Sequence, residues 1–401
     1  MTGSTLLAPA ASARPAAREE GGAPAVAPVD ILGHGVFSAA GFGPEAIAAA
    51  QSRPSAPAGA HGDAQDGVPA ELPGEGWPEL AVRPVTGFDP VAVLGRKGLS
   101  RLSRTDQLVM AACTLAADAV AAPAAQARTG LVLGTTVGSS GAQEVFFRDT
   151  FVQEYPYLVN PSAFPGTLMN SAAGKTAIRL GLTGVNATVS GGPLAALHAL
   201  RYARTALVNG HADRLLAGGV EELSAASAWA WRQSGALHPA AALGEGCGIF
   251  VLERAGAAGA GRGVLGQLLA CETGYADPVT EGPLGVAGRL AAVVRRALRR
   301  SGLPADEPVA VAPGAAARRG WSAVERRALR TALGAVPADR LVRTGALFGE
   351  TYGASVALQL AAVLARWQSG AAAPGERAAV LTAVGPDGSV GAAVIARPDP
   401  R

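Results

Sequence analysis

The sequence predicts an α/β protein built from layers of strands and helices, with two halves of similar order. Apolar runs with the length of strands alternate with amphipathic helical segments in both halves. The length of 401 residues fits two domains or one large double domain. Hydrophobic residues make up 49% and charged residues 16%, whereas charged residues ordinarily reach about a quarter of a chain. We therefore expect a large core and further apolar surface that a partner covers.

The first half is expected to begin at Val29, because residues 1–28 are rich in Ala, Pro and Gly without periodicity and are predicted to be a disordered leader. Turn-forming residues over 52–78 predict an exposed loop. Helix 193–209 has Pro193 at its start, where proline is tolerated. The predicted strands are 29–37, 129–136, 187–190, 214–220 and 248–253, and the predicted helices are 44–51, 104–120, 142–153, 167–181 and 193–209.

The second half repeats this alternation. The predicted strand–helix pairs are 264–271 with 284–301, 308–312 with 321–334 and 341–345 with 353–368, followed by a hairpin that pairs 378–384 with 391–397. Two halves of similar order indicate a duplicated unit, with an N-terminal half over 29–255 and a C-terminal half over 256–401.

Charge and cysteine content exclude several classes of protein. The net charge of +3 comes without a long basic run, so nucleic acid is not an expected partner. The 3 cysteines are too few and scattered for a disulfide framework or a metal site, which favours a reducing cytoplasm. No apolar stretch is long enough to predict a membrane span. We expect neither a metal nor a cofactor, since no histidines stand at metal-ligand spacing.

Glycine-rich motifs occur in a fixed order between residues 130 and 253. They are Gly134–Ser139, Asn160–Asn170, Ala173-Gly174, Gly181–Gly184, Gly210–Asp213, Ala217–Glu222 and Gly244–Gly248. In this order they resemble the β-ketoacyl synthase (ketosynthase) family, and a weaker match extends from Val29 to the C-terminus. The resemblance implies the thiolase-like fold, a duplicated αβαβα layered architecture that is usually dimeric.

A working ketosynthase needs a cysteine thiolate at a tight strand-to-helix turn and two histidines that promote decarboxylation and stabilise an oxyanion. Laid on the family pattern, this chain has Pro193 at the nucleophile position and Gly314 at the first histidine. Gly345 stands where the family carries a lysine, and Glu350 replaces the second histidine. We therefore predict no catalytic residue and no condensation by this chain alone, because members of one catalytic unit act together.

Within the family, an intact fold without its nucleophile resembles the chain length factor, the KSβ subunit of type II polyketide synthases in antibiotic biosynthesis. That resemblance implies a heterodimer with a cysteine-bearing ketosynthase (KSα), an acyl carrier protein bearing the growing polyketide, and a tunnel at the subunit interface. Chain length factors often carry Gln at the nucleophile position, and Pro193 departs from this, which leaves open a divergent branch such as one making reduced polyenes.

Candidate residues for the tunnel and the dimer interface follow from the same resemblance. They are Gln143, Phe146, Phe147, Phe164 and Met169. Bulky rings there would stop elongation by filling volume. The alternative is that these side chains are ordinary core or interface packing.

Other functions stay open at the level of sequence. Ser190 or Glu350 could serve an acyltransferase or decarboxylase, or the chain could be a pure scaffold. Against this, Glu350 could form a structural salt bridge, Cys247 is expected to be a buried inert thiol, and His198 to pack inside its helix. The pairs Arg295-Arg296 and Arg299-Arg300 could dock an acidic carrier protein or form a solvated helix face.

Overall fold

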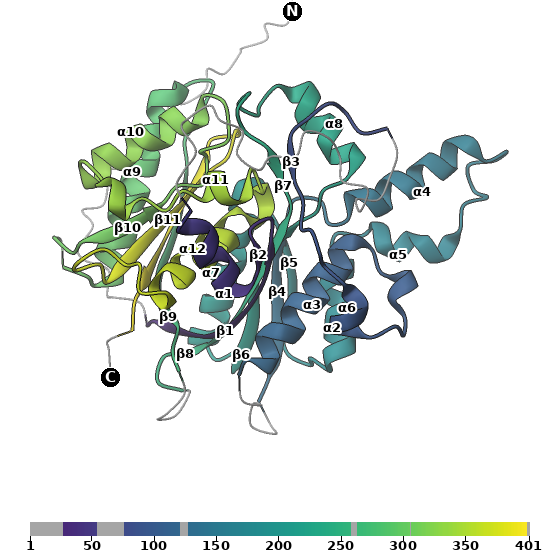
Figure 1. Ribbon diagram of the computed structural model, residues 1–401, viewed down its shortest axis with the longest axis horizontal. Coiled ribbons are helices and arrows are strands. Elements are labelled where there is room, and N and C mark those ends of the chain that lie inside the picture. The colour runs from purple at the N-terminus through teal and green to yellow at the C-terminus, as the bar shows by residue number, and fades with distance from the viewer. Residues whose placement is uncertain (1–26, 54–75, 121–126, 258–262, 305, 399–401) are drawn as a thin grey trace, which may run out of the picture.

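The computed structural model describes residues 27–53, 76–120, 127–257, 263–304 and 306–398. Figure 1 shows strands in the middle of the molecule with helices on both sides, and an arm formed by α4 and α5 that projects from the body. The predicted leader, except for its last two residues, and most of the predicted loop over 52–78 lie outside the described residues.

One half of the sheet has the strand order β5-β4-β6-β8-β1. Its strands are β1 (Val29–Ser38), β4 (Thr129–Thr135), β5 (Asn186–Ser190), β6 (Arg214–Glu221) and β8 (Gly246–Arg254). β4 is parallel to β5 and β6, whereas β8 is antiparallel to β6 and β1. A short strand β2 (Gly41–Phe42) turns back along the end of β1.

The other half of the sheet repeats this order. Its strands are β9 (Gly266–Tyr275), β10 (Val309–Ala312), β11 (Ala378–Val384) and β12 (Ser389–Ala396), arranged β10-β11-β12-β9. A single parallel bridge between Val311 and Leu341 occupies the place that β5 has in the first half. The halves join where the first residues of β1 pair with β9. This equivalence agrees with duplication, while the boundary between residues 255 and 256 stays a prediction.

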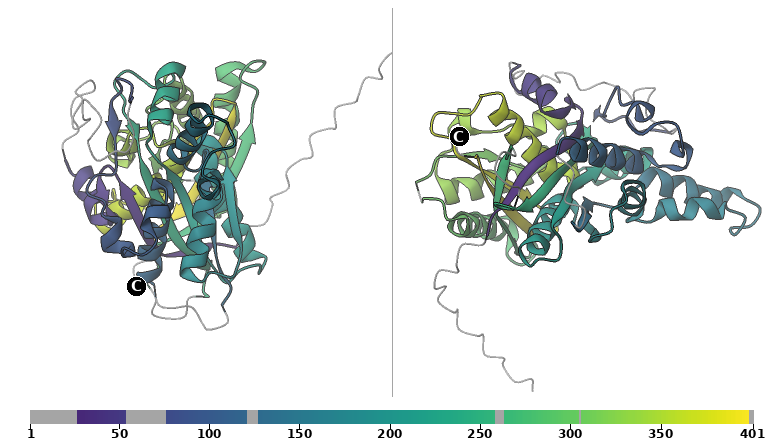
Figure 2. Two further views of the ribbon diagram at one scale, coloured as in Figure 1. Left: turned by 90° about the vertical axis from the view of Figure 1, so that its right-hand side faces the viewer. Right: turned by 90° about the horizontal axis from the view of Figure 1, so that it is seen from below.

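The helices complete five layers, α-β-α-β-α (Figure 2). Helices α3 (Arg104–Asp118) and α6 (Ser171–Leu180) cover the outer face of the first half, and α9 (Gly282–Ser301) and α10 (Trp321–Leu333) lie outside the second. Helices α7 (Ala195–Val208) and α12 (Ser355–Gln368) form the central layer, since each contacts strands of both halves. The thiolase-like layered fold is confirmed.

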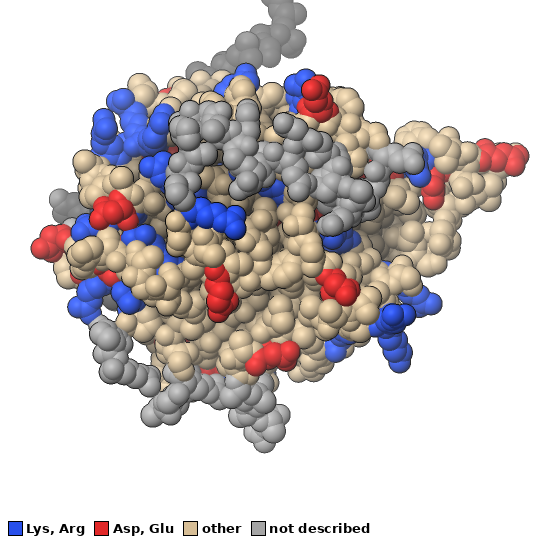
Figure 3. Space-filling model, in the orientation of Figure 1, with Lys and Arg blue, Asp and Glu red and all other residues tan. Residues whose placement is uncertain are grey.

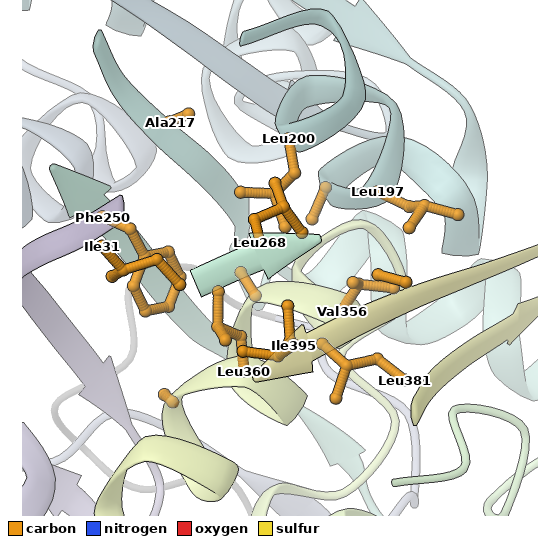
Figure 4. Close-up of a cluster of buried hydrophobic side chains, with 14 of the residues drawn as sticks. Ile31, Leu197, Leu200, Ala217, Phe250, Leu268, Val356, Leu360, Leu381 and Ile395 are labelled. Atoms are coloured by element: carbon orange, nitrogen blue, oxygen red, sulfur yellow. The ribbon is translucent and has the colours of Figure 1, made fainter. Parts of the chain in front are cut away.

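The largest hydrophobic core surrounds the central layer. Figure 4 shows side chains from both halves meeting there: Ile31, Leu197, Leu200, Ala217, Phe250, Leu268, Val356, Leu360, Leu381 and Ile395. Separate clusters lie beneath α3 and α6 and beneath α9 and α10. Because α7 and α12 are enclosed on both faces, nearly every side chain of α12 is buried. Apolar burial of this kind contributes roughly 25 cal/mol per Å².

Most predicted elements are present, and one is wrong. Residues 341–345 form only the bridge at Leu341 before the helix α11 (Thr344–Phe348) begins. The predicted helix over 167–181 is interrupted, because α5 (Phe164–Thr167) ends before α6 starts. Helix α1 (Gly43–Gln51) and helix α4 (Ser140–Val152) agree with the predicted helices at these positions.

Some elements had no counterpart in the sequence prediction. They are α2 (Pro90–Leu94), α8 (Ala225–Ser234) and a two-stranded sheet of β3 (Val82–Arg83) and β7 (Leu243–Gly244). Helix α8 is held at its start by Ser224 and Ser227, whose hydroxyls cap each other's backbone N–H groups. It buries only Ala225 and Ala228, so it lacks an apolar stripe to mark it.

Close contact between β1 and α3 depends on a glycine. A Cβ on Gly35 would lie 2.0 Å from the carbonyl oxygen of Ala112. We predict that Gly35→Ala lowers the free energy of unfolding by about 1–3 kcal/mol through overpacking. Gly288→Ala is the matched control, since Gly288 lies in α9 with open space where a Cβ would stand, and helix propensity should make that change stabilising by about 0.5–1 kcal/mol. Chemical denaturation of both variants checks this, and equal stabilities would contradict the close contact.

Candidate functional site

We call Pro193, Gly314, Gly345 and Glu350 the lost-site positions, because the family pattern predicts a catalytic residue at each of them. The strand-to-helix turn after β5 contains the first of these, Pro193. Ser190 ends β5, Gly191 and Gly192 follow, and Pro193 is buried in the 3₁₀ turn η3 (Gly192–Leu194) that leads into α7. Gly192 has a φ of +51°, a left-handed conformation that glycine adopts without strain. A Cβ on Gly191 would lie 2.9 Å from Cδ2 of His198, so this imidazole packs directly against the turn. The turn thus has the tight strand-to-helix geometry expected at the predicted nucleophile position, and the side chain of Pro193 carries no nucleophilic group.

The other three lost-site positions meet around one pocket. Gly314, Gly345 and Glu350 all line one small pocket that is partly open to solvent, with a volume of about 10 Å³, roughly the room for a single water molecule. Pro193 is not among its lining residues. A Cβ on Gly314 would lie 2.5 Å from the Thr382 carbonyl oxygen and 2.6 Å from Nε2 of Gln359. An imidazole at position 314 would therefore require its neighbours to move.

Glu350 is engaged in a buried ion pair. Its Oε2 lies 3.2 Å from Nε of Arg318, and both side chains are almost completely buried. Its Oε1 accepts a hydrogen bond of 3.0 Å from the Tyr352 backbone N–H. Burial raises the pKa of Glu350, and the charge of Arg318 opposes that rise. The structural alternative for Glu350 is thus observed, because one carboxylate oxygen accepts a backbone hydrogen bond and the other forms an ion pair with Arg318.

Arg318 joins several parts of the site, and no pattern in the sequence pointed to it. Its Nη1 donates to the carbonyl of Val384 at the end of β11, and its Nη2 donates to the Gly314 carbonyl at 3.5 Å. Its Cζ lies 5.9 Å from the ring centroid of Tyr352. One guanidinium therefore contacts the segments carrying two of the lost-site positions. Arg318 does not stand at a position where the family pattern places a histidine, so that pattern could not identify it.

Two adjacent carboxylates, Glu221 and Glu222, stand at the end of β6 and accept hydrogen bonds from neighbouring segments. Glu221 accepts from the Thr136 hydroxyl at 2.6 Å and from the Gly353 N–H at 3.1 Å. Desolvation by the surrounding protein raises the pKa of Glu221 to about 7, although the residue keeps part of its surface. Glu222 accepts from the Thr105 hydroxyl and the Gly141 N–H, and burial raises its pKa as well. These groups tie β6 to the loop before α12 and to the start of α4.

Three further side chains singled out in the sequence are Ser190, Cys247 and His198. The Ser190 hydroxyl donates to the Thr136 carbonyl at 2.8 Å, so its proton is directed to the backbone. Cys247 is buried, as expected, and desolvation raises its thiol pKa well above the ordinary value, which disfavours the reactive thiolate. His198 is half-buried in α7, and burial together with the charge of Arg201 lowers its pKa.

The candidate tunnel residues lie on the projecting arm. Phe146 packs against Phe147 and Phe164, with ring centroids 6.1 Å and 5.9 Å away. The Gln143 amide donates to the carbonyls of Val137 and Thr167, and Met169 is 39% exposed. Neither α4 nor α5 has a buried residue in the isolated chain, so Phe146, Phe147 and Phe164 do not belong to its hydrophobic core. Figure 3 shows mostly uncharged surface on the arm, with acidic side chains at its tip.

The arginine pairs of α9 are largely occupied within the chain. Arg296 and Arg300 both form ion pairs with Glu272, at 2.7 Å and 2.8 Å. Arg295 donates to the Thr331 carbonyl. Basic side chains gather instead over α10 in Figure 3, where Arg326, Arg327 and Arg330 are exposed.

Comparison with known proteins identifies the family to which this chain belongs. The β-ketoacyl synthase N-terminal domain family matches residues 82–258. A solved structure described as the ishigamide ketosynthase/chain length factor is 34% identical, with a TM-score of 0.73 over 92% of this chain and 99% of that one. The chain therefore belongs to the β-ketoacyl synthase family.

Other relatives are more distant. The 3-oxoacyl-[acyl-carrier-protein] synthase 2 of Vibrio cholerae is 30% identical over 148 residues, which is 32% of this chain and only 35% of the relative. The AntDE:AntF structure, a type II polyketide synthase acyl carrier protein in complex with its ketosynthase, shares the fold at 14% identity, with a TM-score of 0.72 over 93% of this chain and 100% of that one.

Membrane spans and metal sites have no candidate in the described part of the chain. Among these residues, no helix combines the length and the apolar character needed to cross a membrane. The same ranges contain no group of three or more His, Cys, Asp or Glu residues that could hold a metal ion.

The buried ion pair leads to a test by double substitution. We predict that Arg318→Met alone lowers the free energy of unfolding by about 3–5 kcal/mol, because it leaves the Glu350 carboxylate buried without its cation. The double variant Arg318→Met/Glu350→Leu should recover a large part of that loss, since neither charge remains. Denaturation of the two single variants and the double variant gives the coupling, and strictly additive losses would show that the pair is not coupled.

Proposed function

We propose that this chain is a non-catalytic chain length factor (KSβ) subunit of a type II polyketide synthase, pairing with an active, cysteine-bearing ketosynthase. The observation that carries the proposal is the 34% identity to a ketosynthase/chain length factor structure along almost the whole of both chains. The chemistry of the lost-site positions supports it. Pro193 offers no nucleophile, Gly314 and Gly345 offer no side chain, and Glu350 is held by Arg318.

The surface supports a large partner of similar fold. Strand β5 ends the sheet order and pairs only with β4 among the described strands, so its outer edge can accept another strand. The arm, which precedes α6 and β5 in the sequence, exposes a set of large apolar side chains that we call the arm face: Val145, Phe147, Phe151, Val152, Tyr155, Tyr157, Leu158, Phe164, Leu168 and Met169. A monomer rarely leaves so many large apolar side chains in water. We assign this face to the ketosynthase interface.

The tunnel is proposed to pass beside the arm face. Phe147 and Phe164 are 55% and 51% exposed and both contact Phe146, so they can line a shared cavity once a partner covers them. Their rings would then occupy volume that a longer acyl chain needs. The substrate class is a polyketide carried as a thioester on an acyl carrier protein, and the acyl chain would lie between the subunits.

We predict that co-expression with the cognate cysteine-bearing ketosynthase gives a stable 1:1 complex. Phe151, which is 85% exposed on the arm face, should be sensitive to a charge, so Phe151→Asp should weaken the complex by about tenfold or more. Val279→Asp is the matched control, because Val279 is 88% exposed in the connection between β9 and α9. Size-exclusion chromatography with light scattering measures both. Acylation of the isolated chain by an acyl carrier protein, abolished by Ser190→Ala, would overturn the proposal in favour of an acyltransferase.

We further predict that Phe147→Ala or Phe164→Ala in the folded complex lengthens the polyketide product, since each change removes a ring from the proposed tunnel wall. Mass spectrometry of the products measures chain length. Tyr202→Ala on α7 is a control at an exposed aromatic outside the arm. An unchanged product from both arm variants would favour a scaffold without a tunnel.

A further inference from the structure

The turn that carries Pro193 is covered by the side chain of Tyr352. A Cβ on Gly192 would lie 3.2 Å from Cε1 and 3.3 Å from the hydroxyl oxygen of Tyr352, so the ring rests directly on the glycine. The two turns η3 and η5 (Tyr352–Ala354), which begin α7 and α12, are in contact. The ring therefore lies beside the buried backbone where the family pattern places a nucleophile.

Tyr352 is held in an unusual backbone conformation. Its φ of +36° is the only positive value at a non-glycine residue in the described part of the chain. An aromatic residue adopts such a φ at a cost of about 1–3 kcal/mol, which the surroundings must impose. The N–H of Tyr352 donates to Glu350, and the N–H of the next residue, Gly353, donates to Glu221. Two carboxylates thus fix the peptide groups on both sides of Tyr352.

The ring is also braced from its sides. Trp231 of α8 meets it edge to face, with centroids 5.2 Å apart and an interplanar angle of 86°. The buried guanidinium of Arg318 lies near the same ring and is itself held by Glu350 and by the Val384 carbonyl. Burial is the main cause that raises the pKa of the Tyr352 phenol. The charge of Arg318 lowers this pKa, whereas the charges of Glu350, Asp387 and Glu221 raise it. The phenol is neutral and packs as an aromatic wall.

We propose that Tyr352 is a plug that closes the abandoned nucleophile turn of this subunit to acyl chains and to the pantetheine thiol. Trp231 and Arg318 hold the plug in place. This closure is a property of the chain itself. The consequence of this closure rests on the proposed function. An acyl chain on the carrier protein cannot enter this subunit at the turn and is confined to the active partner and the interface. Tyr352 would then determine where in the heterodimer the acyl chain binds.

A single introduced cysteine can report on the closure. The chain's own cysteines, Cys113, Cys247 and Cys271, are all buried, and burial raises their pKa, in the case of Cys271 to about 12. They should react slowly with iodoacetamide, because the thiolate is the nucleophile. Pro193→Cys places one thiol at the turn, and Ser369→Cys, on an exposed residue after α12, is the open reference.

The test compares alkylation rates of the 401-residue chain in four variants: Pro193→Cys, Ser369→Cys, and Pro193→Cys combined with either Tyr352→Gly or Tyr352→Phe. Tyr352→Gly removes the ring and tolerates the positive φ, so the fold should be retained. Tyr352→Phe keeps the ring. We expect Pro193→Cys, alone or combined with Tyr352→Phe, to react at least about tenfold more slowly than Ser369→Cys, and the Tyr352→Gly combination to approach that reference.

Two results would overturn the plug. One is a Pro193→Cys thiol that already reacts as fast as Ser369→Cys, because the turn would then be open. The other is a folded Pro193→Cys/Tyr352→Gly variant that stays as slow as Pro193→Cys alone, because something other than Tyr352 would then close the turn. Thermal unfolding midpoints establish that each variant is folded. The readout needs no ketosynthase, so failure of the heterodimer leaves this test intact.

Discussion

The whole architecture depends on burying α7 and α12 between the two halves of the sheet. Helices enclosed on both faces must be apolar nearly all round, and the strands against them must allow close approach. Gly134 and Gly219 provide this approach, since a Cβ on the first would lie 2.4 Å, and on the second 2.7 Å, from atoms of α7. The first turns of the two helices, η3 and η5, then meet at one place. That meeting point is the candidate site.

Polar groups at the meeting point follow from the same constraint. A buried charge is costly unless it is paired, so Arg318 forms an ion pair with Glu350 and donates to the carbonyls of Val384 and Gly314. Glu350 stands at the position where the family pattern predicts the second catalytic histidine. Glu221 and Glu222 are likewise held by hydroxyl and backbone N–H donors. The site thus keeps the geometry of a strand-to-helix turn while its interior is filled by an ion pair and an aromatic ring. This filling agrees with a chain whose chemistry, as proposed, resides in its partner.

Much of the fold and part of the site could be predicted from the order of residues. Alternating strand and helix patterns indicated both halves, and glycine-rich motifs indicated the family and the positions of Pro193, Gly314, Gly345 and Glu350. The strand predicted over 341–345 was wrong because a short apolar run is consistent with either a strand or a helix, and only Leu341 finds a partner strand. Arg318, Tyr352 and Trp231 were not identified, since their roles depend on contacts between distant segments.

The sequence by itself indicated the layered class, the repeated strand order and, through the resemblance to the family, four positions at which catalytic residues are expected to be replaced. These are local properties, because periodicity and spacing are carried by neighbouring residues. The tertiary structure decided what fills the vacated space. Tyr352 reaches Gly192 only because η3 and η5 come together, and Arg318 reaches Glu350 only because the chain folds back between them. No spacing along the chain encodes a contact between segments that lie so far apart in the sequence.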